Sequence, residues 1–219
     1  FDHVVISSSL IAFNGNLNSL AYGTPSYGIQ GADYNTFVPS MHILNCTVVS
    51  NGTSGISLGF VETDIRNTII ADNGWEESRS RTFDYEFGLY GLYFTVMRNS
   101  TVWNRKAGRG ISLYKDVSTT YCRLYYPVNL YSFDPKLADD LSLSDLSPLV
   151  KRGEDLDQTD FPVAEDVYGN AWLSGEYDIG CFKSSAAKSH TVKYADVYVA
   201  ADGDDTNTGA DAEHPLKSL

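Results

Sequence analysis

Two short patterns of apolar and polar positions alternate along residues 28–113. The first is apolar-x-Asn-small-x-apolar, at residues 43–48, 65–70 and 97–102. The second is Gly-apolar-x-x, which begins at Gly28, Gly55, Gly88 and Gly110. Val, Ile and Thr are frequent in these segments, and no long apolar run has the 3.6-residue period of a helix. The patterns therefore predict a series of short β-strands.

The patterns recur at a regular interval, as from Asn45 to Asn67. That interval is about 22 residues, which is a typical length for one unit of a repeat protein. Two longer intervals, at 28–45 and 67–88, predict loops inserted into an otherwise regular coil. A unit of this size cannot bury a core of its own, so it needs neighbours roughly 4.8 Å above and below. The spacing therefore predicts an all-β stack of parallel coils.

The phase of the apolar positions changes at the asparagine. Ile43 stands two residues before Asn45, so strand alternation predicts that both side chains point inward. The next apolar residue, Val48, comes three positions later, and a single left-handed residue at the asparagine explains the slip. We expect the inward amides of Asn45, Asn67 and Asn99 to form a hydrogen-bonded ladder. The alternative is a β-sandwich of hairpins, which does not require one side-chain type in register.

Residues 45–51 and 67–73 resemble the coil signatures of right-handed parallel β-helix proteins of the pectate-lyase-like type. Further parts of the chain are similar to the segment that closes bacterial extracellular β-helix proteins: Phe133–Leu137, Leu146–Val150, Gly153, Asp166–Asn170 and Tyr177–Gly180. The resemblance implies a right-handed single-stranded parallel β-helix, a solenoid of about 22 residues per coil.

The same resemblance suggests how the chain is divided. Residues 198–209 look like the strand and turn with which such β-helices begin. We therefore expect coils at 1–132, a closing segment at 133–182, a linker at 183–194, and at 195–219 the opening strand of a second, truncated β-helix. The sequence is expected to be a piece of a longer protein.

Composition narrows the classes of partner. The 219 residues carry a formal net charge of −12, which argues against sequence-independent binding of nucleic acid and against docking to anionic lipid. No run of about 18 apolar residues predicts a membrane span. Three cysteines, Cys46, Cys122 and Cys181, lie far apart without the spacing of metal ligands, so we expect buried free thiols.

The family resemblance implies that substrate lies along the outward face of the Gly-apolar-x-x strands and on their flanking loops. The predicted substrate-binding residues are Gln30, Ser57, Trp75, Tyr90, Ser112 and Lys115. Aromatic faces suit the apolar faces of sugar rings. The alternative is an ordinary solvated face with one long loop.

The sequence signal for catalytic residues is weaker than that for substrate-binding residues. A lyase needs a base and a cation beside a uronate carboxylate, and the candidates for these roles are Arg109, Lys106 and Lys115. A glycosidase needs two carboxylates, for which Asp84 and Glu86 have suitable parity. Neither arrangement is specific, and the four dispersed histidines predict no triad.

Two further groups of charged residues have a specific interpretation in this fold. Arg66 and Arg98 should stack outward on another sheet, paired with Glu62 or Asp64. The oxygens of Asp202, Asp204 and Asn207 would suit a Ca²⁺ loop, although the neighbouring glycines fit a plain turn equally well; no other cofactor is implied.

The sequence thus predicts a secreted or cell-surface β-helix that engages polysaccharide, with a polysaccharide lyase or glycoside hydrolase fragment as one form of it. The alternative is a non-catalytic scaffold, stalk or adhesin that contacts other domains or chains of a surface assembly. Binding to nucleic acid and insertion into a membrane are not expected.

Overall fold

The computed structural model describes residues 3–14, 27–30, 40–52, 54–57, 62–73, 87–90, 94–103, 124–131 and 134–186, together with 204 and 217. Over these residues the protein is all-β, with strands and no helix. The strands are β1 (His3–Ser7), β2 (Leu10–Ala12), β3 (Tyr27–Gln30), β4 (Ser40–Leu44), β5 (Thr47–Val49), β6 (Ser54–Ser57), β7 (Glu62–Arg66), β8 (Ile69–Ala71), β9 (Phe87–Tyr90), β10 (Phe94–Trp103) and β11 (Leu124–Tyr131).

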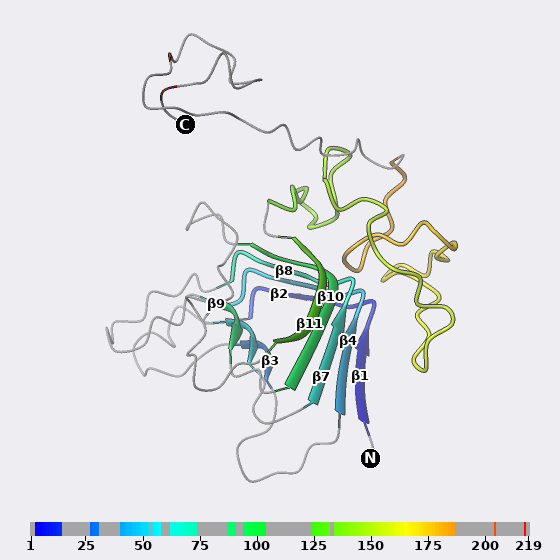
Figure 1. The fold of residues 1–219 in the computed structure, drawn as a ribbon. Helices are drawn as coiled ribbons and strands as arrows, with labels where there is room; N and C mark the ends of the chain where they lie inside the picture. Colours follow the sequence, from blue (N-terminus) through cyan, green and yellow to red (C-terminus); the bar gives the residue numbers. More distant parts are fainter. Residues whose placement is uncertain are drawn as a thin grey trace, which may run out of the picture. The chain divides into compact units, whose positions relative to one another are not determined.

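All pairs between these described strands are parallel (Figure 1). One sheet follows the path β1-β4-β7-β10-β8-β5-β2, with β11 beside β10, and a second has the order β3-β6-β9. Each strand therefore pairs with the strand that holds the same place in the next repeat. A sandwich of hairpins requires antiparallel neighbours, so that alternative is wrong for the described strands.

The register supports the predicted repeat interval for one step of the stack. Ile43 pairs with Ile65 and Val48 pairs with Ile70, and both pairs have the same separation along the chain as Asn45 and Asn67. The neighbouring steps are longer: Ile65 pairs with Met97, and Ile6 pairs with Ile43. The longer intervals carry the inserted residues between strands, as the sequence pattern indicates.

Left-handed residues form the corner between the first and second strands of each repeat. The φ angles are 48° at Asn45, 48° at Asn67 and 43° at Asn99, as the phase slip predicts. A second corner follows at Ser50 and Asp72, with φ angles of 51° and 49°. Asn adopts this region more readily than other residues with a Cβ, which explains its recurrence at the first corner.

The core has three apolar clusters. The first lies between the sheets and comprises Ile29, Met41, Ile43, Cys46, Val48, Ile56, Ile65, Ile70, Met97 and Val102. The other two join the outer face of the strands to residues 134–186: Val49 and Ile69 pack with Leu149 and Ile179, whereas Leu44 packs with Tyr177. The segments that resemble the close of a β-helix therefore cover one side of the stack.

Asparagine ladders are present, but the predicted direction of the first ladder is wrong. Asn67 Nδ2 donates a hydrogen bond to Asn45 Oδ1 at a distance of 3.0 Å. Asn45 Nδ2 in turn donates to the carbonyls of Asp178 and Gly180, and Asn99 Nδ2 donates to that of Arg152. These amides are buried under residues 134–186 rather than between the two sheets. Strand parity fails at the corner because a left-handed residue is not extended.

The second asparagine of each repeat forms another ladder, which sequence reasoning did not assign. Asn51 Nδ2 donates a hydrogen bond to Asn73 Oδ1 at 2.8 Å, and Asn14 Nδ2 donates one to Asn51 Oδ1 at 2.9 Å. A Cβ on Gly28 of β3 would lie 2.7 Å from Asn51 Nδ2 and 2.9 Å from Val48 in the core. This ladder therefore faces the opposite sheet.

Residues 134–186 hold their shape by turns instead of strand ladders. Asp166 organises one of these turns, because its carboxylate accepts hydrogen bonds from the backbone N–H groups of Tyr168, Asn170 and Lys183. Contacts divide the chain into a unit of residues 1–189 and a unit of residues 190–219. No helix in the described residues is long and apolar enough to cross a membrane.

Candidate functional site

The predicted substrate-binding sheet is β3-β6-β9. Gln30 pairs with Ser57, and Ser57 pairs with Tyr90, so three of the predicted residues are adjacent in register. Gln30 is exposed and Ser57 is half-buried. The predicted residues Trp75, Asp84, Glu86, Arg109, Ser112 and Lys115 lie outside the described residues.

The possible Ca²⁺ loop is described only at Asp204, which is exposed; Asp202 and Asn207 lie outside the described part of the chain. Within the part that the structure does describe, no group of three or more His, Cys, Asp or Glu side chains is arranged to hold a metal ion.

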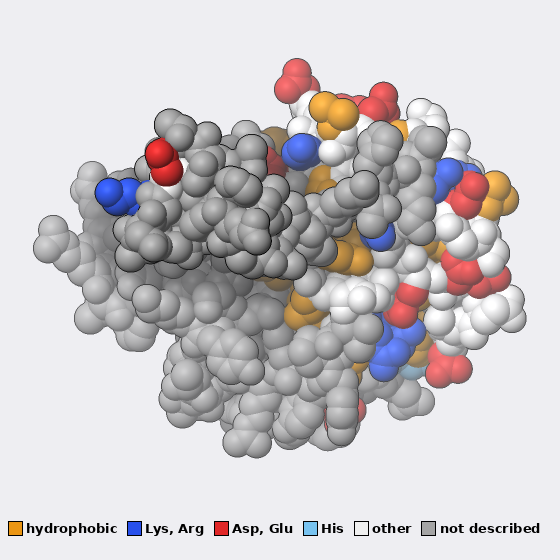
Figure 2. Space-filling model, turned by 45° about the horizontal axis from the view of Figure 1, so that its top comes forward, with side chains coloured by type: hydrophobic (Ala, Val, Ile, Leu, Met, Phe, Trp, Pro, Cys, Tyr) orange, Lys and Arg blue, Asp and Glu red, His pale blue; other side chains and the backbone are white. Residues whose placement is uncertain are grey.

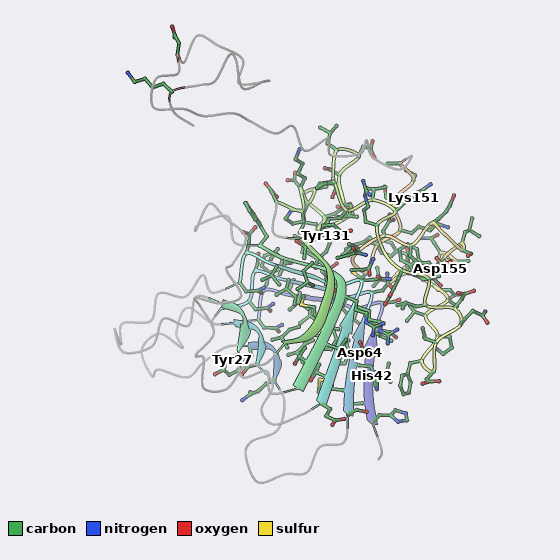
Figure 3. The ribbon with its side chains drawn as sticks, viewed as in Figure 1. Tyr27, His42, Asp64, Tyr131, Lys151 and Asp155 are labelled. Carbon is green, nitrogen blue, oxygen red and sulfur yellow. The ribbon has the colours of Figure 1, made fainter. Side chains whose placement is uncertain are left out.

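A cavity of about 440 Å³ lies on the outer face of β4, β7 and β10. Its polar lining comprises Ser40, His42, Glu62, Thr63, Asp64, Arg66 and Arg98. Alternate residues of a strand share one face, which explains why each strand contributes residues two positions apart. Figure 3 shows His42 and Asp64 side by side on neighbouring strands, and Figure 2 shows acidic and basic side chains interspersed on the visible described face.

A chain of polar contacts crosses this cavity. Ser40 Oγ lies 3.2 Å from His42 Nε2 on the same strand. The other imidazole nitrogen, Nδ1, lies 3.7 Å from Asp64 Oδ2 across the β4–β7 pair, a distance slightly longer than a hydrogen bond. Asp64 also accepts from Arg66, whose Nη2 is 2.8 Å from Oδ2. The contacts place a hydroxyl, an imidazole, a carboxylate and a guanidinium in sequence.

The surroundings of His42 favour its neutral form. Burial lowers its pKa below 6.5 and outweighs the opposing effect of Asp64, and the electrostatic effects of His3 and Arg66 lower it further. Phe161, from residues 134–186, packs against the imidazole with ring centroids 4.1 Å apart. Nδ1 is buried, faces Asp64 and has no hydrogen-bond partner among the described residues. A proton on Nδ1 would leave Nε2 as an acceptor for the Ser40 hydroxyl.

The two arginines of the cavity differ in their partners. Arg66 and Arg98 pair in register, as the sequence predicts for outward stacked positions. Arg66 is neutralised by Asp64, as expected, and its Nε also lies 3.6 Å from Glu154 Oε1. Arg98 Nε is buried and has no hydrogen-bond acceptor among the described residues. Because Arg66 is paired with Asp64 whereas Arg98 also lines the cavity, the guanidinium of Arg98 is the cation that the cavity can offer to a ligand.

Sequence reasoning missed this cluster, although the repeat contained a signal for it. Ser40 and His42 share strand parity, and Asp64 stands one repeat interval after His42, its partner in the β4–β7 register. The expectation that the histidines form no triad considered only their separation along the chain. In a parallel stack, residues one repeat apart become neighbours.

No protein-family model, curated protein or solved structure matches the chain. Functional inference therefore depends on the geometry of the cavity and of the two sheets.

Proposed function

We propose that this chain is a right-handed single-stranded parallel β-helix of the pectate-lyase-like type that engages polysaccharide outside the cell. Parallel pairing, the regular step between β4 and β7 and the left-handed asparagine corners support the fold proposal. Stacked coils suit an extended polymer because they present the same strand positions at regular spacing.

The cavity on β4, β7 and β10 is the observation that carries the functional proposal. Its volume of about 440 Å³ falls in the range of small-ligand sites. Hydroxyl, imidazole, carboxylate and guanidinium groups line it, and such groups hydrogen-bond sugar hydroxyls. Arg98 lines the cavity, and its guanidinium would receive a sugar carboxylate. Acidic glycans are therefore the favoured class despite the net charge of −12.

The proposed ligand class is tested by binding of the purified protein to a panel of neutral and uronate-containing glycans. Arg98→Gln should weaken binding of uronate glycans about 10-fold or more, because a charge-assisted hydrogen bond contributes roughly 1.5–3 kcal/mol. Lys136→Gln, which removes an exposed positive charge from residues 134–186, is the matched control and should leave binding unchanged.

The double variant Gln30→Ala/Ser57→Ala tests the originally predicted face in the same assay. Loss of binding in this variant, together with unchanged binding in Arg98→Gln, would indicate that the glycan binds to β3-β6-β9. Absence of binding to every glycan by the unmodified protein would contradict the proposed function. The measurement is isothermal titration calorimetry, with thermal melting to show that each variant is folded.

A non-catalytic scaffold within a surface assembly is the second candidate. β1 and β2 end the path of the large sheet, and near this edge Val4, Val5, Leu10 and Phe13 are exposed. Exposed apolar edge strands favour pairing with another strand. Concentration-dependent self-association without glycan binding would support this candidate.

The proposal covers glycan engagement whether or not the glycan is cleaved. Lyase action would release unsaturated products, and glycosidase action would release reducing ends. Both are measured on the glycans that bind.

A further inference from the structure

We propose that Ser40, His42 and Asp64 form a hydrolytic site for O-acyl esters, with Ser40 as the nucleophile. The two distances along the chain of contacts, 3.2 Å from Ser40 to His42 and 3.7 Å from His42 to Asp64, have the order and the atoms that such a site needs. Catalytic contacts are often longer in the absence of substrate. The three side chains lie in one cavity, which gives an ester access to the hydroxyl.

The reaction would proceed in two balanced steps. Ser40 Oγ attacks the ester carbonyl while His42 Nε2 takes the hydroxyl proton, and the same proton passes to the departing alcohol as the C–O bond breaks. Water then attacks the acyl-serine, His42 takes a proton from the water, and the carboxylic acid leaves as the Ser40 hydroxyl is restored. Ester and water are consumed, and one acid and one alcohol are formed.

Asp64 is a positioning residue in this scheme. Its carboxylate faces Nδ1 and favours the tautomer in which Nε2 accepts a proton. Phe161 packs on the same imidazole and fixes the plane of the ring. Two further charged or titratable groups act on His42: His3 on β1 and Arg66 on β7. Glu62 lines the same cavity, and Glu154 pairs with Arg66.

The position of Arg98 suggests the class of ester, and this step depends on the proposed function. Arg98 pairs with Arg66, and Arg66 pairs with Leu44, so Arg98 lies two strands away from Ser40 and four residues further along. Strand geometry places their Cα atoms roughly 16 Å apart. One small acyl group cannot contact both residues. The fitting substrate is an O-acylated acidic glycan, with the ester at Ser40 and a uronate carboxylate at Arg98.

The expected rate is modest. General-base catalysis contributes about 10²- to 10⁴-fold. The rate should rise with pH as His42 loses its proton. Because burial lowers the His42 pKa, the midpoint should lie below 6.5.

The first experiment uses p-nitrophenyl acetate and a fluorophosphonate probe, neither of which requires glycan binding. The fluorophosphonate should label Ser40, as shown by peptide mass spectrometry, with loss of fluoride. Ser40→Ala and His42→Gln should each reduce acetate release about 100-fold or more. Ser142→Ala is the matched control: Ser142 Oγ lies 2.6 Å from the Asp140 carboxylate, but Ser142 forms no contact with a histidine among the described residues.

Asp64→Asn tests the positioning role separately. Asp64 raises the pKa of His42, so its removal should move the pH midpoint lower as well as reduce the rate. A loss of activity from poor folding would not shift the midpoint, and thermal melting of each variant identifies that case. Absence of labelling at Ser40, or full activity in folded Ser40→Ala, would overturn the proposal.

The second experiment measures acetate release from an acetylated uronate polymer and from an acetylated neutral polysaccharide. Arg98→Gln should raise KM on the uronate polymer about 10-fold more than it raises KM on the neutral polymer. Hydrolysis of p-nitrophenyl acetate at Ser40 without any glycan binding would retain the ester site and reject the proposed function. An equal KM for both polymers, unaffected by Arg98→Gln, would reject the acidic substrate class.

Discussion

The amide of Asn67 donates a hydrogen bond of 3.0 Å to the amide oxygen of Asn45, the residue 22 positions earlier. Both side chains also bond to residues 134–186: Asn67 Nδ2 lies 2.8 Å from the carbonyl oxygen of Glu154, and Asn45 Nδ2 lies 3.1 Å from those of Asp178 and Gly180. This ladder therefore joins one repeat to the next and joins both repeats to the segment that covers them.

Asn45→Ala should destabilise the protein by about 2–4 kcal/mol, because buried carbonyls lose their donor and alanine disfavours the left-handed conformation. Asn45→Gly removes the same amide but tolerates the 48° φ angle, so it should cost about 1 kcal/mol less. Urea unfolding of the two variants separates the amide from the backbone effect. Equal stability of both variants would show that the backbone term is negligible.

Gly180→Ala should be more damaging than Gly175→Ala. Both glycines have positive φ angles, 110° and 75°. A Cβ at position 180 would lie 2.7 Å from Ile69 Cδ1 and 2.9 Å from Thr47 Oγ1, whereas a Cβ at position 175 has nothing within 4 Å. Gly175→Ala should cost about 1–2 kcal/mol from backbone strain.

Steric overlap at position 180 should add about 1–3 kcal/mol to that cost. Thermal unfolding of the two variants measures the difference. Similar melting temperatures would mean that Ile69 and Thr47 move aside at little cost.

Protonation of Asp166 should destabilise the folded protein in acid. Burial raises the pKa of this carboxyl, but hydrogen bonds from Asn170, Lys183 and Tyr168 outweigh that effect and hold the pKa below 3.8. The unfolded state then binds the proton more readily, so the stability contributed by Asp166 is present above pH 3.8 and is lost as pH falls through the lowered pKa.

Asp166→Asn provides the comparison for that pH dependence. An amide oxygen can still accept from Tyr168 and Asn170 but does not titrate, so the variant should be less stable at neutral pH and lose less stability between pH 4 and pH 2. Urea unfolding across this range tests the prediction. Parallel stability curves for the two proteins would contradict it.

Cys46 and Cys181 should resist alkylation in the folded protein. Burial raises the pKa of Cys46 to about 12 and that of Cys181 to about 11, so little thiolate is present at neutral pH. Cys181 belongs to a segment held by turns, whereas Cys46 lies in the apolar cluster between the sheets. Local opening should therefore expose Cys181 at lower urea concentrations than Cys46.

A Cys122→Ser background restricts the reaction with iodoacetamide to these two thiols, and peptide mass spectrometry follows each one. Simultaneous labelling of both would show that the covering segment and the stack unfold as one unit. Fast labelling without urea would contradict the buried positions of the thiols.

The fold was more predictable from the sequence than the candidate site was. Short-range patterns fixed the parallel strands, because Asn45 and Asn67 stand one repeat apart and both occupy left-handed corners. The same patterns failed for the direction of the Asn45 amide, since its partners Asp178 and Gly180 lie more than 130 residues away. No local pattern encodes such a partner.

The polar chain in the cavity was predictable only in part. The pairing of Arg66 with Asp64 followed from strand parity and the need to neutralise stacked cations. The contact of Ser40 with His42 follows from parity as well, but placing Asp64 beside His42 required the repeat interval to be applied to polar residues. The contact of Phe161 with His42 could not be predicted, because Phe161 belongs to a segment that has no repeat.

The bonds between the asparagine ladder and residues 134–186 also constrain the order of assembly. The carbonyls of Arg152, Glu154 and Asp178 accept hydrogen bonds from asparagines on three successive repeats. These acceptors find their donors only after the repeats have stacked with the correct spacing, and a strand displaced by one residue would present the wrong side chain. Docking of this distant segment therefore discriminates between native and slipped stacks, and it should complete folding late.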